Sequence, residues 1–124
     1  MQHDNGNIFS FQRLKVWQKS ILFAKKVILI VDGLNTDRKH YRLIEQLESA
    51  STSVAMNIAE GKGRQSTKEF IQFLYIARGS LFEVITLLII FYEAGWISMK
   101  ILQEIQNDAE EITKMLNSLI KSMK

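Results

Sequence analysis

The clearest chemistry in the sequence is an anion-binding turn. Gly61-Lys62-Gly63-Arg64 puts two cations and flexible backbone directly before a predicted helix that begins at Ser66, and Lys68 follows in its first turn. The first amides of a helix are unpaired and the helix dipole is positive there, so such an end attracts anions. Lys62, Arg64 and Lys68 therefore suit phosphate oxygens, and a plain solvated turn is the alternative. The turn lacks a preceding strand and the Gly-Lys-Ser/Thr ending of a P-loop, which excludes a nucleotide cradle of that type.

Patterns typical of catalysis or metal binding are sparse. The chain has no cysteine, which excludes disulfides, zinc–thiolate sites and thiol nucleophiles. His3 and His40 are far apart and lack metal-ligand spacing, so we expect both to be solvated. Glu60 and Glu83 resemble a bundle carboxylate pair, but no Glu-x-x-His motif accompanies them. We therefore expect a protein that is not an enzyme and that uses no metal and no cofactor.

Positive charge gathers in the first part of the chain. The 16 Lys and Arg against 13 Asp and Glu give a net charge of +3, which alone does not imply nucleic acid and suits plain solubility. The balance is +4 over residues 11–34, +1 over 35–65 and −1 from residue 66 onward. The candidate phosphate contacts are therefore Arg13, Lys15, Lys19, Lys62, Arg64 and Lys68.

Four helices are predicted to position these residues. The chain has 124 residues, no proline and six glycines, which favours one domain of long helices joined by short turns. We expect a flexible tail over residues 1–10 and a single domain over residues 11–124. The helices are expected over residues 11–31, from a cap at Thr36 or Asp37 to residue 60, over residues 66–94, and onward from a cap at Ser98. Gly61 is expected to close the second helix in the left-handed conformation, Gly95 to break the third, and Ser66 with Glu69 to form a capping box.

Each predicted helix carries an apolar stripe at three- and four-residue spacing, which marks a buried face. In chain order the stripes are Leu14, Trp17, Ile21, Ala24, Ile28 and Val31; Leu43, Leu47, Ala50, Val54 and Ile58; Phe70, Phe73, Leu74, Ala77, Leu81, Val84, Leu88 and Phe91; and Ile101, Ile105, Ile112, Leu116 and Leu119. The polar face of the last helix is expected to be solvated; it comprises Glu104, Asp108, Glu110, Glu111 and Lys114. Short connections then predict an all-α, up-down-up-down antiparallel four-helix bundle.

Apolar side chains exceed what one stripe per helix can hold. The helix over residues 66–94 is apolar almost all round, and the helix over residues 11–31 nearly so. Such helices must be covered. We exclude lipid on length, since Lys25 and Lys26 interrupt the first helix, and expect self-association through these two helices. A monomer that buries the third helix centrally is the alternative. The start of the chain shows no secretory signal, so a cytoplasmic location is expected.

Several segments together resemble one known family. They are Leu14-Lys15-Val16-Trp17-Gln18-Lys19, Gln46-Leu47, Asn57-Ile58-Ala59-Glu60-Gly61, Gly63-Arg64 with Ser66, Lys68-Glu69-Phe70, and the run from Phe73 to Leu81 with Glu83. The chain is similar over residues 9–95 to the bacterial four-helix-bundle family of the 23S ribosomal RNA intervening-sequence protein. It departs from the family pattern at Val54-Ala55-Met56, where a proline often occurs, and lacks the usual Phe-Pro after the first helix.

The resemblance implies a ring-like homopentamer, an association with structured RNA, and no catalytic residues. A related branch looks like the accessory subunit of diversity-generating retroelements, a basic pentamer that binds a reverse transcriptase. The polar positions of the family motif are Asn57, Glu60, Arg78 and Glu83, for which we expect structural roles. An antiparallel pair would have Asn57 and Glu60 face Arg78, Ser80 and Glu83. Counting outward from the turn puts residue 57 near residue 70, however, so the spacing argues against contact between Asn57 and Arg78 inside one chain and leaves contact across a subunit boundary open. We therefore expect an oligomeric scaffold that binds structured RNA through a basic surface. The alternative is a protein–protein adaptor, for example for a nucleic-acid-processing enzyme.

Overall fold

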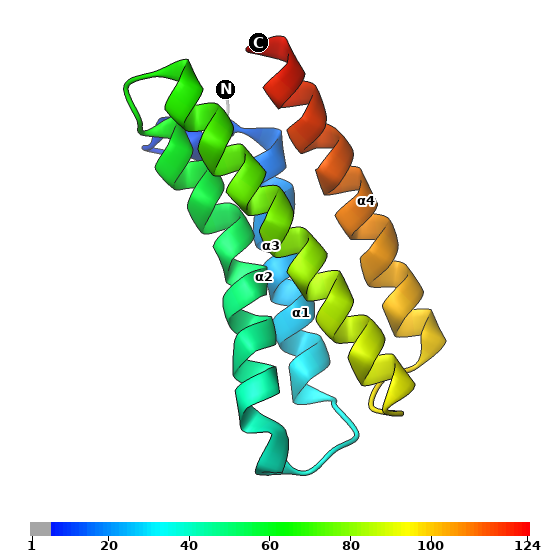
Figure 1. The fold of residues 1–124 in the computed structure, drawn as a ribbon. Coiled ribbons are helices and arrows are strands. Elements are labelled where there is room, and N and C mark those ends of the chain that lie inside the picture. The colour runs from blue at the N-terminus through cyan, green and yellow to red at the C-terminus, as the bar shows by residue number, and fades with distance from the viewer. Residues whose placement is uncertain (1–5) are drawn as a thin grey trace.

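The computed structural model describes residues 6–124, and within that range the chain is helical with no strand (Figure 1). Four α-helices are present: α1 (Lys15–Asp32), α2 (Tyr41–Lys62), α3 (Thr67–Glu93) and α4 (Met99–Ser122). Two short 3-10 helices, η1 (Ser10–Arg13) and η2 (Arg38–His40), precede α1 and α2. The prediction of an all-α chain with four helices is confirmed.

The helices surround one apolar core. α2 packs against α1 and α3, and α4 packs against α3 and α1, so α1 and α3 lie across the core from each other. α3 is the main contributor, because its buried face runs its whole length from Phe70 to Phe91. On α2 and α4 the predicted stripes also supply the core, through Leu47, Val54 and Ile58 on one and Ile105, Ile112 and Leu116 on the other.

The predicted stripe of α1 is confirmed at Ala24, and Leu14, Trp17 and Val31 pack against the core, but it is wrong at Ile21 and Ile28. Val16, Phe23 and Val27 enter the core, while Ile21 and Ile28 of the predicted stripe are 42% and 40% exposed. Because α1 is apolar on more than one side, its periodicity fits more than one rotation about the helix axis. Packing against α2 and α4 selects the rotation that buries the larger Phe23 ring.

The first helix also begins later than expected. Gln12 accepts hydrogen bonds through its side-chain oxygen from the amides of Ile8 and Phe9, at 2.9 and 2.8 Å, which closes η1 as a separate turn. Leu14 then takes an extended conformation (φ −73°, ψ 124°), and α1 begins at the next residue. The predicted tail over residues 1–10 lies partly outside the described residues, and its flexibility stays a prediction.

Three polar side chains cap helix starts as the sequence indicates. Asp37 accepts from the amide of Lys39 at 3.1 Å, although it caps η2 rather than α2. Ser66 accepts from the amide of Glu69 at 3.1 Å, and Ser98 accepts from Ile101 at 3.2 Å. At the other end of α3, Gly95 takes φ +83°, which supports its predicted role as the break.

Gly61 does not end α2 in the left-handed conformation, and this prediction is wrong. The residue is buried inside the last turn of α2, where α3 comes very close. A Cβ on Gly61 would lie 2.6 Å from the Cβ of Phe73 and 2.9 Å from the Cδ1 of Phe70. The glycine is therefore needed for the close approach of two helices rather than for backbone freedom.

The exclusion of lipid on length does not hold for α3. This helix has 27 residues and a mean hydropathy of 1.9 over its most apolar 18-residue window, which is long and apolar enough to cross a membrane. The central helix of a helical bundle meets the same criterion, since it must face apolar partners on several sides. Only 33% of that window is buried in the single chain, which leaves much apolar surface on α3.

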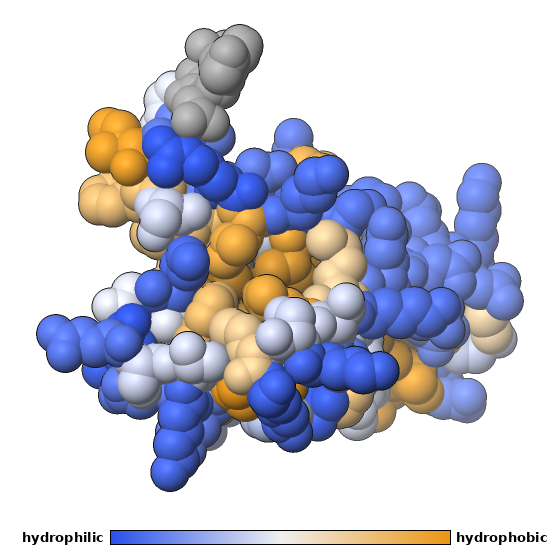
Figure 2. All heavy atoms as spheres, turned by 90° about the horizontal axis from the view of Figure 1, so that it is seen from above, coloured by the Kyte–Doolittle hydropathy of each residue, from blue (hydrophilic) through white to orange (hydrophobic). Residues whose placement is uncertain are grey.

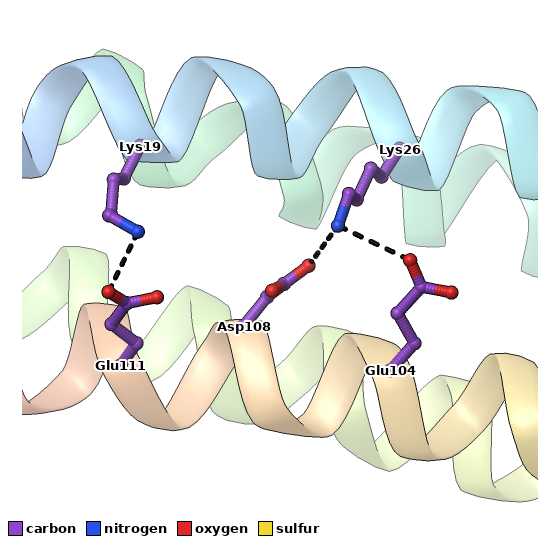
Figure 3. Close-up of polar contacts among 5 residues, drawn as sticks. All are labelled: Lys19, Lys26, Glu104, Asp108 and Glu111. Carbon is purple, nitrogen blue, oxygen red and sulfur yellow. Dashed lines mark hydrogen bonds and ion pairs between the residues drawn. The ribbon is translucent and has the colours of Figure 1, made fainter.

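Ion pairs join α4 to α1, so the polar face of α4 is not simply solvated as predicted (Figure 3). Lys26 contacts Asp108 at 2.8 Å and Glu104 at 3.4 Å, and Lys19 contacts Glu111 at 2.7 Å. The hydrogen bond from Lys26 to Asp108 raises the pKa of Lys26 above its usual value of 10.5. These side chains are substantially exposed, so each pair adds at most about 1 kcal/mol.

We predict that Gly61→Ala destabilises the protein by about 1–3 kcal/mol, because the new methyl group must displace Phe70 or Phe73. Urea unfolding of the variant measures the loss. Gly63→Ala is the matched control, since a Cβ there meets only carbonyl oxygens, at 3.6 and 3.7 Å. Equal midpoints for both variants would contradict the close approach of α2 and α3.

We also predict a pH-dependent stability difference between the wild type and Lys26→Met. The raised pKa means that pairing stabilises the fold fully below about pH 10.5 and is lost as the pH rises through the folded-state pKa of Lys26. The wild type should thus exceed Lys26→Met by up to about 1 kcal/mol at neutral pH, and the difference should shrink in strong alkali. Lys25→Met is the control for removal of an exposed lysine. A difference that stays constant across this range would rule out the pairing.

Candidate nucleic-acid interface

Most of the predicted phosphate contacts meet at one end of the bundle. The start of α1, the turn between α2 and α3, and the last turn of α4 all lie at this end (Figure 1). It gathers Arg13 and Lys15 before and at the start of α1, with Lys62, Arg64 and Lys68 around the turn. Lys121 in the last turn of α4 and Lys124, which follows α4, join them, and neither was predicted from the sequence. We call these seven side chains the basic end.

Lys121 and Lys124 are recognisable as part of the basic end only from the fold. Residues 121–124 are 50 residues or more from the turn in sequence, and their local balance of charge is unremarkable. The fold returns α4 to the same end, where Lys124 donates a hydrogen bond to the hydroxyl of Tyr75 at 2.9 Å. That bond lowers the pKa of Tyr75 below its ordinary value. If the antiparallel order of the helices is extended to the last helix, it predicts that Lys121 and Lys124 lie at the same end as the α2–α3 turn.

Aromatic rings hold the turn cations in place. The guanidinium of Arg64 lies 4.8 Å from the ring centre of Phe73, and the ammonium of Lys62 lies 5.9 Å from that of Phe70. Arg64 also donates to Glu60 at 2.9 Å, so part of its charge is offset within the turn. All three polar groups are exposed, so an anion has access to the cations.

Lys19 lies away from the basic end, on the flank between α1 and α4. Its ion pair with Glu111 at 2.7 Å offsets its charge, so a phosphate would have to compete with a carboxylate already in place. The structure therefore does not bring Lys19 together with the other five predicted contacts. This pair is not visible in the sequence, because Glu111 is distant in the chain and was expected to face solvent.

The basic end has an apolar centre. Seen from above, the molecule shows an orange area in the middle, surrounded mostly by hydrophilic side chains (Figure 2). Next to the start of α1, a groove between α1 and α4 is lined by Leu14, Val16, Met115 and Leu119, with Lys15 beside them. This end therefore combines a cationic rim with apolar surface.

The polar residues of the family motif do not form one cluster. Asn57 donates to the carbonyl and hydroxyl oxygens of Ser53, both at 2.8 Å, and the Ser53 hydroxyl lies 2.9 Å from that of Ser80. Glu83 accepts from Gln46 at 3.2 Å, and Glu60 pairs with Arg64. The prediction that Asn57 and Glu60 face Glu83 is wrong, because residue 80 lies opposite residue 53 and residue 83 opposite residue 46.

Arg78 points away from α2. It donates to Asn117 of α4 at 2.7 Å, and its guanidinium lies 4.8 Å from the ring centre of Tyr75. Contact between Asn57 and Arg78 inside one chain, doubtful already from their spacing, is not seen. Arg78 instead links α3 to α4, which is a structural role.

The part of the chain that the structure describes brings no metal-binding set of side chains together. Within residues 6–124, no group of three or more His, Asp or Glu side chains is placed to hold a metal ion. His40 is half-buried against the ring of Trp96, with 4.6 Å between ring centres, rather than solvated as expected. His3 lies outside the described residues.

Comparison with known proteins agrees with this fold. A solved structure from Bacteroides thetaiotaomicron, described as a protein with unknown function from the S23 ribosomal protein family, is 31% identical to this chain with a TM-score of 0.79. The similarity covers 86% of this chain and 98% of that one. None of the curated proteins matches the sequence. The sequence model of the 23S rRNA-intervening sequence protein matches residues 12–118, from η1 into the last turns of α4. The chain therefore belongs to the 23S rRNA-intervening sequence protein family.

Proposed function

We propose that this protein is a non-enzymatic cytoplasmic scaffold that assembles into a ring-like homo-oligomer and binds structured RNA through its basic end. The observation that carries the proposal is the charge at that end. The segments 10–15, 60–70 and 118–124 hold seven basic side chains against two acidic ones, Glu60 and Glu69, a local balance of +5 in a chain of net charge +3. Positive charge is thus concentrated at one end of the bundle rather than spread over its surface.

The proposed scaffold is an up-down-up-down antiparallel bundle. Contacts between neighbouring helices support this topology, since sequence number rises along one helix as it falls along the next. Residue 53 meets 80 and residue 46 meets 83 between α2 and α3, and residue 78 meets 117 and residue 75 meets 124 between α3 and α4. The start of α1, the end of α4 and the α2–α3 turn are then brought to one end.

Two uncovered apolar faces support self-association. α1 exposes Ile21, Leu22, Ile28 and Leu29, and α3 exposes Tyr75, Ile76, Phe82, Ile89 and Ile90. Because α1 and α3 lie across the core from each other, these are two different faces. A contact between unlike faces is heterologous, and it closes a ring when the rotation from copy to copy completes a full turn. The family resemblance suggests five copies.

A ring of this kind multiplies the basic end. Side-by-side contacts under cyclic symmetry turn the same end of every bundle to the same side of the ring. Five copies of +3 give +15, and phosphate contacts that are weak in one copy act together. The exposed aromatic rings near the cations are Phe9 and Tyr75, and Tyr75 is engaged by Lys124 and Arg78. We therefore favour recognition of RNA shape over base stacking.

A protein–protein adaptor is the second candidate. The apolar groove of Leu14, Val16, Met115 and Leu119 beside the basic end favours it, since apolar contacts are typical of a protein partner such as a polymerase. For binding to RNA phosphates, the logarithm of the association constant falls linearly with the logarithm of the salt concentration. The slope is about −0.7 to −0.9 for each phosphate neutralised. A partner held by apolar contacts should show little salt dependence.

We predict that reversing Lys62, Arg64 and Lys68 to Glu abolishes retention of a structured RNA by the assembled protein, because about three phosphate contacts per copy become repulsive. Light scattering on a sizing column, with and without RNA at low and moderate salt, measures the complex. The matched control reverses Lys39, Arg42 and Lys100, which lie away from the basic end and change the net charge equally. Undiminished retention in the first variant would remove the turn from the interface. Failure of the wild-type assembly to hold RNA at low salt would favour the adaptor.

We predict that Phe82→Glu lowers the solution mass to that of one chain without loss of helicity. Phe82 is 54% exposed, so a carboxylate is tolerated in the single chain but not inside an apolar contact between copies. Sedimentation and circular dichroism report mass and helix content. Met56→Glu on α2, where the native side chain is 66% exposed, is the control outside the two faces. An unchanged mass for Phe82→Glu would exclude this part of α3 from the contact.

A further inference from the structure

Gly79 stands in the middle of α3 without a packing reason inside its own chain. It is exposed, and a Cβ built on it meets no atom within 4 Å. Glycine inside a helix costs stability relative to alanine, because it loses more conformational freedom on folding. Gly61 shows the contrast, since there a Cβ has no room. Within one chain, alanine at position 79 would serve better than glycine.

The neighbours of Gly79 make a specific shape. Tyr75, Ile76 and Phe82 lie one helical turn before and after it, and all three are large, apolar and exposed. Gly79 therefore leaves a gap in an otherwise continuous apolar surface. Such a gap lets another helix approach the α3 backbone closely, with the large side chains packing on either side of it.

We propose that Gly79 is the point where a helix of a second copy of this chain crosses α3 in van der Waals contact with its backbone. This inference rests on the proposed self-association, and it places the closest approach between two copies at Gly79. A second copy of the chain is the favoured partner because each copy also carries an uncovered apolar face on α1. That face is present wherever the protein is, at the same concentration as the α3 face.

Charge on the two faces is complementary. The α1 face has Lys25 between Leu22 and Leu29, and Lys25 has no ion-pair partner among residues 6–124. The α3 face carries Glu83, one turn from Gly79. Among the described side chains Glu83 accepts a hydrogen bond from the neutral Gln46 and forms no ion pair. A contact between the two faces would therefore bring a cation and an anion together at an apolar interface, which favours this pairing over α3 against α3.

The test uses the opposite effects of one methyl group. In the Phe82→Glu background, where we expect a single chain, Gly79→Ala should raise the thermal midpoint by a few degrees, since the helix gains and no atom is displaced. In the otherwise wild-type chain, Gly79→Ala should raise the concentration of half-dissociation roughly tenfold, and Gly79→Leu by more. Gly33→Ala is the matched control, because a Cβ there meets only a carbonyl oxygen at 3.8 Å at the end of α1.

The outcomes separate the two proposals. A wild type that assembles, with Gly79→Leu assembling equally well, would overturn the close contact and leave the ring standing. A wild type that is monomeric at every concentration would overturn both. A lower thermal midpoint for Gly79→Ala in the single chain would show that the glycine serves the fold, and would also overturn the contact.

Discussion

The close contact of α2 with α3 is the constraint on which the rest of the structure depends. It is the most extensive contact between elements, and it is built on small residues: Gly61 against Phe70 and Phe73, and Ser53 against Ser80. Small side chains allow two helices to pack closely, and the paired serine hydroxyls fix which turn of α2 lies opposite which turn of α3. Once this pair is set, α1 and α4 fill the two remaining positions around the core. The cationic turn between α2 and α3 is then held at one end of the bundle, with its cations resting on the same phenylalanines.

Regular features of the structure were predictable from the sequence, and the exceptions have physical causes. The number and type of the helices, the caps at Ser66 and Ser98, and the core stripe of α3 follow from spacing and capping chemistry alone. The rotation of α1 does not, because Ile21 and Phe23 are both apolar and only the volume available between α2 and α4 decides which is buried. The role of Gly61 could not be predicted, because a glycine before a turn fits either a left-handed helix end or a close helix approach, and only the neighbouring helix distinguishes them.

The candidate site was predictable in part for the same reason. Lys62, Arg64 and Lys68 are close in sequence, so their grouping needs no knowledge of the fold. Lys19 was included because its partner Glu111 is invisible at that distance along the chain, and Lys121 and Lys124 were left out because they approach the turn only through the fold. Ion pairs with α4 thus offset the lysine charges on the flank, while basic residues outnumber acidic ones at the end, and the bundle becomes electrically polar along its axis. A mild net charge conceals that polarity.

The ion pairs between α1 and α4 also bear on how the chain closes on itself. α2 and α3 meet across a turn of four residues, so their contacts enclose short loops and cost little chain entropy. Lys26 and Asp108 are 82 residues apart, so the seam between α1 and α4 encloses most of the chain. Closing it from the unfolded chain costs more entropy than closing the α2–α3 turn, and it is a less extensive contact than that between α2 and α3. The bundle therefore consists of an extensively packed α2–α3 hairpin and two outer helices, α1 and α4, with a smaller contact between them. We expect local opening to begin at this α1–α4 contact.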